Sequence, residues 1–99
     1  MRESEIERYL IWHVLRLGGK AYKFKSANHR GVSDRIVCLP GGQTWFVELK
    51  AKAGWLSPLQ KLFAQDMARM GQQYACLWTK EDVDAWVAAL PRGSGDVPL

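Results

Sequence analysis

The sequence contains two carboxylates and one amine, Asp34, Glu48 and Lys50, at positions that would allow them to act together. Glu48 and Lys50 lie two positions apart in a segment rich in β-forming residues. On a strand their side chains would share one face, with Cα atoms about 6.6 Å apart. Charged groups inside an otherwise apolar strand are costly to bury without compensation. A divalent cation would compensate them, because ions such as Mg²⁺ take carboxylate and water oxygens as ligands.

These side chains predict metal-assisted phosphodiester hydrolysis. Asp34 and Glu48 would bind Mg²⁺ or Mn²⁺, and the ion would neutralise phosphate charge and lower the pKa of a water molecule. Lys50 would orient that water or stabilise the developing negative charge. From the residues alone an alternative stays open, in which Asp34 is a turn residue and Glu48 with Lys50 is an exposed pair on an edge strand.

Three short motifs resemble those of the VRR-NUC family, the virus-type replication and repair nucleases of the PD-(D/E)XK superfamily. The resemblance implies that Asp34 and Glu48 bind the metal, that Lys50 is the catalytic lysine and that Gln60 supports the site. This sequence departs from the family pattern at two positions, where Ser33 and Lys52 each stand in place of a Pro that is common in the family. The motifs are Gly31-Val32-Ser33-Asp34, Phe46-Val47-Glu48-Leu49-Lys50 and Leu56-Ser57-Pro58-Leu59-Gln60.

The resemblance also implies that a glutamate of the first helix completes the site, and Glu3 and Glu7 are the two candidates. They are four positions apart and therefore lie on the same side of a helix. Family spacing to Ile6 favours Glu3, whereas spacing back from Gly18, as in related junction resolvases, favours Glu7. We rank Glu3 first and expect it to be a metal ligand. The alternative for either residue is a solvated carboxylate favoured by the helix dipole.

The helices and strands around these residues can be predicted from the spacing of apolar residues and from turn and capping residues. Apolar residues spaced four, four and three apart predict an amphipathic helix over residues 3–17. Ser57 before Pro58 marks the start of a second helix, and Thr79 with Asp82 marks a third. We expect strands over 21–25, 34–39, 44–50 and 73–78, and later helices over 57–70 and 80–90.

This order of helix, three strands, helix, strand and helix is α/β. The resemblance implies a restriction-endonuclease-like core, with a mixed central sheet flanked by helices. The fourth strand follows a crossover helix, so it should lie parallel to a strand already in the sheet. We expect a single PD-(D/E)XK nuclease domain over residues 1–90 and a flexible C-terminal tail over 91–99.

The hairpin between Asp34 and Glu48 sets a geometric condition for a shared metal. If Gly41-Gly42 were a plain two-residue turn, Pro40 would pair with Gln43 and Asp34 with Leu49. Asp34 would then face away from Glu48, because directly opposed residues share a face. A shared metal therefore requires a pairing shifted by one residue, through a three- or five-residue loop or a β-bulge. Otherwise Asp34 must sit just before the regular strand.

Composition is compatible with a polyanionic partner. Lys and Arg outnumber Asp and Glu by 14 to 10, and the chain has five Trp, a residue enriched at interfaces. Cys38 and Cys76 each lie in an apolar run and are expected to be buried thiols. We expect DNA as the partner, contacted by basic side chains around the site: His29, Arg30, Lys23, Lys25 and Lys52.

By the same resemblance we expect an endonuclease for branched DNA such as the Holliday junction. It should act as a homodimer, whose two-fold symmetry matches such a substrate and which buries one or more of Trp12, Trp55, Trp78 and Trp86. The alternative is a non-catalytic nucleic-acid-binding module with the nuclease fold. A charged, helical N-terminal segment argues against a signal peptide, and no apolar run is long enough to span a membrane. We therefore expect a cytoplasmic protein of a bacterial or phage-infected cell.

Overall fold

The computed structural model describes residues 2–24, 31–51 and 54–91. Its elements have the predicted types and order, and their boundaries agree with the predicted ones within two residues. Most of the predicted tail, residues 92–99, lies outside the described residues. The elements are α1 (Glu3–Arg16), β1 (Lys20–Lys23), β2 (Arg35–Leu39), β3 (Gln43–Leu49), α2 (Pro58–Arg69), β4 (Gln73–Leu77) and α3 (Lys80–Ala89).

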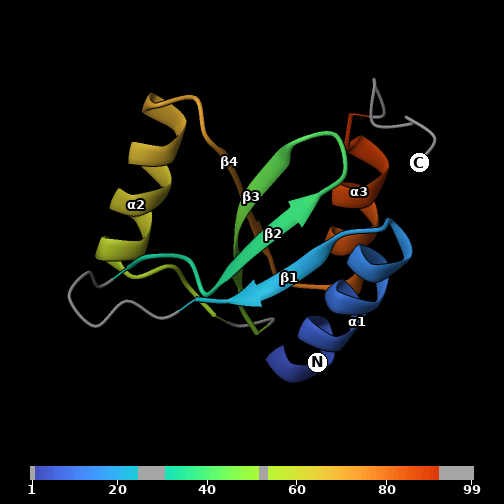
Figure 1. Ribbon diagram of the computed structural model, residues 1–99. Helices are drawn as coiled ribbons and strands as arrows, with labels where there is room; N and C mark the ends of the chain where they lie inside the picture. Colours follow the sequence, from blue (N-terminus) through green and yellow to red (C-terminus); the bar gives the residue numbers. More distant parts are fainter. Residues whose placement is uncertain (1, 25–30, 52–53, 92–99) are drawn as a thin grey trace.

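The four strands form one mixed sheet in the order β1-β2-β3-β4. The pairs β1–β2 and β2–β3 are antiparallel, and β3–β4 is parallel. The parallel pair confirms the expectation from the crossover, because α2 carries the chain back to the end of the sheet at which β3 began. Figure 1 shows α1 and α3 on one side of the sheet and α2 on the other.

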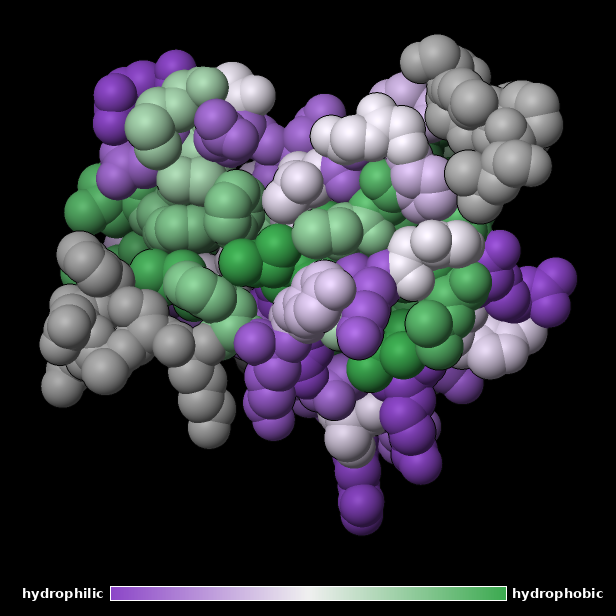
Figure 2. All heavy atoms as spheres, viewed as in Figure 1, coloured by the Kyte–Doolittle hydropathy of each residue, from purple (hydrophilic) through white to green (hydrophobic). Residues whose placement is uncertain are grey.

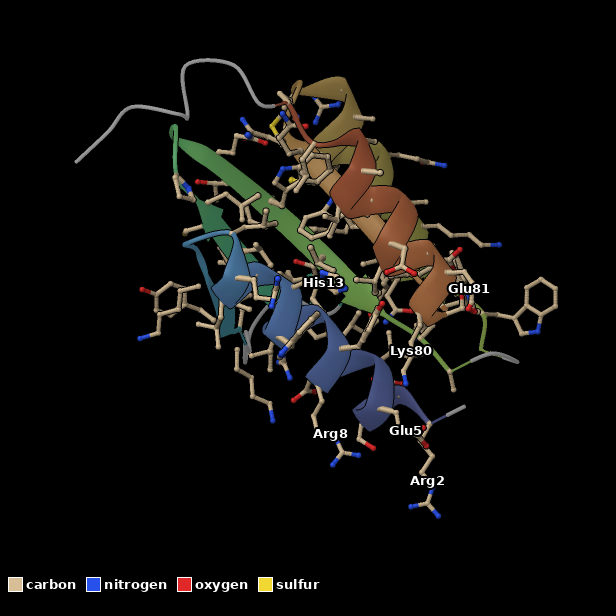
Figure 3. All side chains as sticks on the ribbon, turned by 90° about the vertical axis from the view of Figure 1, so that its right-hand side faces the viewer. Arg2, Glu5, Arg8, His13, Lys80 and Glu81 are labelled. Atoms are coloured by element: carbon tan, nitrogen blue, oxygen red, sulfur yellow. The ribbon has the colours of Figure 1, made fainter. Side chains whose placement is uncertain are left out.

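The main core lies between α1, α3 and one face of the sheet. Odd-numbered residues of β2 and β3 point to this face, so the even-numbered ones point toward α2. The outward side of α1 is polar, as an amphipathic helix requires, and Arg2, Glu5 and Arg8 point away from the sheet (Figure 3). The buried core residues are Ile6, Leu10, Val14, Val37, Leu39, Val47, Leu49, Leu77, Val83 and Trp86.

The α2 face of the sheet is only partly covered. An aromatic cluster of Phe46, Phe63 and Tyr74 joins α2 to β3 and β4, with ring centroids 5.8 and 6.0 Å apart in edge-to-face geometry. Figure 2 shows apolar side chains gathered over α2 and the adjacent sheet. Helix α2 packs mainly against β4, so Cys38 on β2 is exposed. The expectation of two buried thiols is therefore wrong for Cys38, and Cys76 is only partly buried.

The tryptophans fall into two groups. Trp86 is 7% exposed and packs edge-to-face on Trp45, and the Trp78 indole N–H donates to the Gly54 carbonyl at 2.9 Å. Trp12 and Trp55 are 52% and 86% exposed. Trp86 is thus used within this chain, whereas Trp12 and Trp55 are open to a partner. No helix in the described part of the chain combines the length and apolarity needed to cross a membrane.

Candidate active site

The β2–β3 hairpin has the shifted pairing that a shared site requires. Leu39 pairs with Gln43, so the connection is a three-residue loop, Pro40 to Gly42. Gly41 and Gly42 have φ values of 87° and 79°, a region that glycine enters without steric cost. One step beyond the last regular pair, the same register sets Asp34 opposite Glu48, on the α2 face. The Asp34 carbonyl also accepts from the Phe24 N–H at 3.0 Å, which extends the β1–β2 pairing.

Glu48 is the buried centre of the cluster. It is 4% exposed, and its Oε2 accepts from Gln60 Nε2 at 3.3 Å and lies 3.8 Å from Lys50 Nζ. Burial, reinforced by the Asp34 carboxylate and opposed by Lys50, raises the pKa of Glu48 to about 7. A carboxylate with this pKa is held at a cost in the absence of a cation.

Asp34 has an oxygen that the protein leaves unsatisfied. Its Oδ1 is buried and has no hydrogen-bond partner among the described residues. Burial raises the pKa of Asp34, while Arg35 and the Leu49 backbone amide act in the opposite direction. An orphaned buried carboxylate oxygen facing a second carboxylate needs a positive partner. Carboxylate oxygens are the ligands that Mg²⁺ and Mn²⁺ prefer, so the donor set fits such an ion.

Gln60 links the site to the start of α2. As predicted, Ser57 is the N-cap: its Oγ accepts from the Gln60 N–H at 3.1 Å, and Gln60 Oε1 accepts from the Ser57 N–H at 2.8 Å. The amide nitrogen of the same side chain then donates to Glu48. The amide group of Gln60 can do both, because its oxygen accepts from the Ser57 N–H while its nitrogen donates to Glu48. A glutamate would serve the cap but set another carboxylate against Glu48.

Lys50 follows directly after β3 and remains accessible. Its backbone N–H donates to the Leu77 carbonyl at 3.0 Å, which fixes the chain beside β4. Its side chain is 20% exposed and lies on the same face as Glu48. The ammonium is therefore held beside the buried carboxylate and can reach a bound anion.

The two first-helix candidates act on different residues of the sheet. Glu7 forms an ion pair with Arg35, whose side chain is 5% exposed on the α1 face, so Glu7 is engaged away from the carboxylate pair. The negative charge of Glu3 raises the pKa of both Asp34 and Glu48, so Glu3 is the one that acts on the pair. In the described ranges no three Asp, Glu, His or Cys side chains lie close enough to hold one ion. Direct binding of the ion by Glu3, which is exposed at the start of α1, therefore stays a prediction.

Sequence reasoning missed Arg35 and the packing role of Gly31. The Arg35 guanidinium donates to the Asp34 carbonyl at 3.0 Å and thereby fixes the backbone that carries Asp34. The sequence does contain a signal for this role, because Arg35 is a charged residue in the apolar run directly after Asp34. At Gly31, with φ of 86°, a Cβ would lie 2.4 Å from the Leu59 carbonyl oxygen. The loop before Asp34 therefore packs directly on the first turn of α2.

The predicted DNA-contacting residues are mostly outside the described part of the structure. Lys25, His29, Arg30 and Lys52 lie there, and the structure gives no placement for them. Lys23 is exposed at the end of β1. It lies on the strand that adjoins β2 and pairs with Arg35, one residue after Asp34.

Comparisons with known proteins agree with this geometry. No family model matches the sequence. The chain is 42% identical over 77 residues to a protein of Acyrthosiphon pisum secondary endosymbiont phage 1 described as "Putative nuclease p44", covering 78% of this chain and 83% of that protein. A solved structure described as "VRR_NUC domain" superposes with a TM-score of 0.84 at 24% identity, covering 90% of this chain and 97% of that one. With the fold shared almost end to end and the sequence shared with a nuclease-named relative, the chain belongs to the VRR-NUC family of nucleases.

Proposed function

We propose that this VRR-NUC nuclease is a Mg²⁺- or Mn²⁺-dependent DNA endonuclease. One observation carries the proposal: Asp34 and Glu48 meet across adjacent strands, beside Lys50, and a buried Asp34 oxygen lacks a partner in the described residues. In this proposal Asp34 and Glu48 hold the ion. When bound, the ion supplies positive charge toward the phosphate and lowers the pKa of water.

The other residues of the site act on the substrate or on Glu48. Lys50 binds a phosphate oxygen and stabilises the negative charge that develops during hydrolysis. Gln60 keeps the Glu48 carboxylate in one orientation, because its own side chain is fixed by the helix cap. Glu3 adds negative charge that favours cation binding and completes the set of ligands predicted from the sequence.

Metal-dependent cleavage by matched variants tests the proposal. The protein would be incubated with linear duplex and four-way junction DNA in MgCl₂, MnCl₂ or EDTA. We expect wild type and Glu81→Gln, an exposed control on α3, to cleave only with metal. Asp34→Asn and Glu48→Gln should not cleave, yet should bind DNA as well as wild type or better, because a negative charge facing phosphate is removed. Cleavage by both site variants would refute the assignment. Salt-dependent binding without cleavage under any metal would support the alternative, a non-catalytic binding module.

The finer parts of the proposal are branched DNA as substrate and a homodimer as the active form. A two-fold dimer places two identical sites on a symmetric junction, and exposed Trp12 offers apolar surface for a second copy. The phage origin of the relative supports action in the cytoplasm of a bacterial or phage-infected cell. Sedimentation at micromolar concentration, with and without junction DNA, tests the dimer. A monomer that cuts junction and linear DNA equally would contradict both parts.

A further inference from the structure

The segment between Lys50 and α2 carries the most exposed of the large apolar side chains in the described residues. Trp55 is 86% exposed. A side chain this exposed does not pack in the core, so contact with a base or with another protein remains as its role. The backbone on both sides of Trp55 decides between these two roles.

On its N-terminal side, Trp55 is attached directly to the site. A Cβ on Gly54 would lie 3.4 Å from both Cβ and Cδ of Lys50, so Gly54 rests against the aliphatic stem of that lysine. The Gly54 N–H donates to the Ala51 carbonyl at 2.7 Å, and its carbonyl accepts from the Trp78 indole at 2.9 Å. The Cα of Trp55 is consequently no more than about 9 Å from the Lys50 stem.

On its C-terminal side, Trp55 is tied to the other half of the site. Ser57, two residues later, is the N-cap of α2 and is bonded in both directions to Gln60. Gln60 in turn donates to Glu48. The backbone of Trp55 is thus held between a contact with Lys50 on one side and a connection to Glu48 on the other, so the indole is attached close to a phosphate bound at the site.

We propose that Trp55 stacks on an unstacked DNA base next to the scissile phosphate and so selects DNA in which base stacking is interrupted at the cleavage point. The inference rests on the proposed nuclease function and names the feature of branched DNA that the site recognises. In a continuous duplex both faces of each base are covered by its neighbours, and only an unstacked base offers a face to an indole. Stacking tolerates any sequence, because every base has a π-face. A rigid aromatic side chain gives large contact area at low entropic cost.

Binding in EDTA separates this inference from catalysis, because no metal-dependent cleavage occurs there. Fluorescence anisotropy would compare a continuous duplex with the same duplex carrying a short single-stranded branch. We expect Trp55→Ala to weaken binding to the branched DNA about tenfold, the share of one stacked base, with little change for the duplex. Trp55→Phe should keep most of the affinity. Met70→Ala, which removes an exposed apolar side chain at the end of α2 farther from Ser57, should change neither. Tryptophan fluorescence should be quenched by branched DNA in wild type and much less in Trp55→Ala.

Three results would overturn the inference. They are equal losses of affinity for both DNAs in Trp55→Ala, no loss for either, and a change in sedimentation of Trp55→Ala with unchanged DNA affinity. The last would place Trp55 at a contact between two copies of this chain. Because Trp55 is exposed, we expect its variants to fold with unchanged Tm. If wild type binds branched DNA through Trp55 but never cleaves it with metal, the proposed nuclease activity fails while the stacking role stands.

Discussion

Removing the charge of Glu48 should stabilise the metal-free protein at and above neutral pH. Burial, reinforced by the Asp34 carboxylate, raises the pKa of Glu48 from 4.5 to about 7. The folded protein therefore binds this proton more tightly than the unfolded chain does. For a carboxyl group with a raised pKa, this contribution to stability is fully present below about pH 4.5 and is lost as the pH rises through 7.

The size of the effect follows from the two pKa values. Each tenfold difference in proton affinity corresponds to about 1.4 kcal/mol, so ionising Glu48 costs the fold about 3 kcal/mol by pH 8. In Glu48→Gln the side-chain shape is kept and its oxygen still accepts from Gln60, but the variant loses attraction to Lys50, which offsets part of the gain. We expect Glu48→Gln to be about 2 kcal/mol more stable than wild type at pH 8, and the two to be similar at pH 4.5.

Urea denaturation in EDTA at several pH values between 4.5 and 8, followed by tryptophan fluorescence, measures this difference. Glu81→Gln on α3 is the control, and comparison at each pH removes the titration of groups common to both proteins. Mn²⁺ should reverse the order at pH 8, because it stabilises wild type by binding and leaves the variant unchanged. If Glu48→Gln is less stable than wild type at pH 8 in EDTA, the reasoning from burial is wrong.

Three further changes test other parts of the site. Lys50→Ala should slow cleavage by about 10²- to 10³-fold with unchanged Mn²⁺ affinity in calorimetry, and Lys50→Arg should not restore the rate; near-normal turnover of Lys50→Ala would remove it from the mechanism. Glu7→Ala should lower the free energy of unfolding by about 3 kcal/mol in urea, because the buried Arg35 guanidinium loses its partner; a change of only a few tenths of a kcal/mol would mean that water compensates it. Gly31→Ala forces a Cβ to 2.4 Å from the Leu59 carbonyl and should cost about 1–3 kcal/mol together with most of the cleavage activity, so full activity would show that the loop adapts.

The local parts of the fold were predictable because short-range chemistry determines them. Ser57 with Pro58 and Thr79 with Asp82 are capping residues, and both helices begin where these residues indicate. Counting residues along the hairpin showed which strand registers would set Asp34 and Glu48 on one face. The structure has such a register, and Gly41 and Gly42 adopt the positive φ values that its three-residue loop requires.

The remaining parts depend on how whole elements are placed. Helical spacing puts Glu3 and Glu7 on one side of α1, but the path of α1 across the sheet decides which of them meets Arg35. Likewise, the apolar run around Cys38 does not show that α2 packs mainly against β4 and leaves Cys38 on β2 uncovered. Burial of Arg35 also depends on tertiary packing, because only the assembled α1 face supplies its partner.

Gln60 makes the first turn of α2 and the orientation of Glu48 a single cooperative unit. Its side-chain oxygen accepts from the Ser57 N–H and its side-chain nitrogen donates to Glu48, so fraying of that turn breaks both hydrogen bonds at once. A chain emerging from the ribosome has Asp34 and Glu48 before α2 is complete. Such a nascent chain carries both carboxylates of the proposed site but lacks the contact that orients them. In the proposed mechanism the orientation of Glu48 is therefore acquired only when the first turn of α2 has formed.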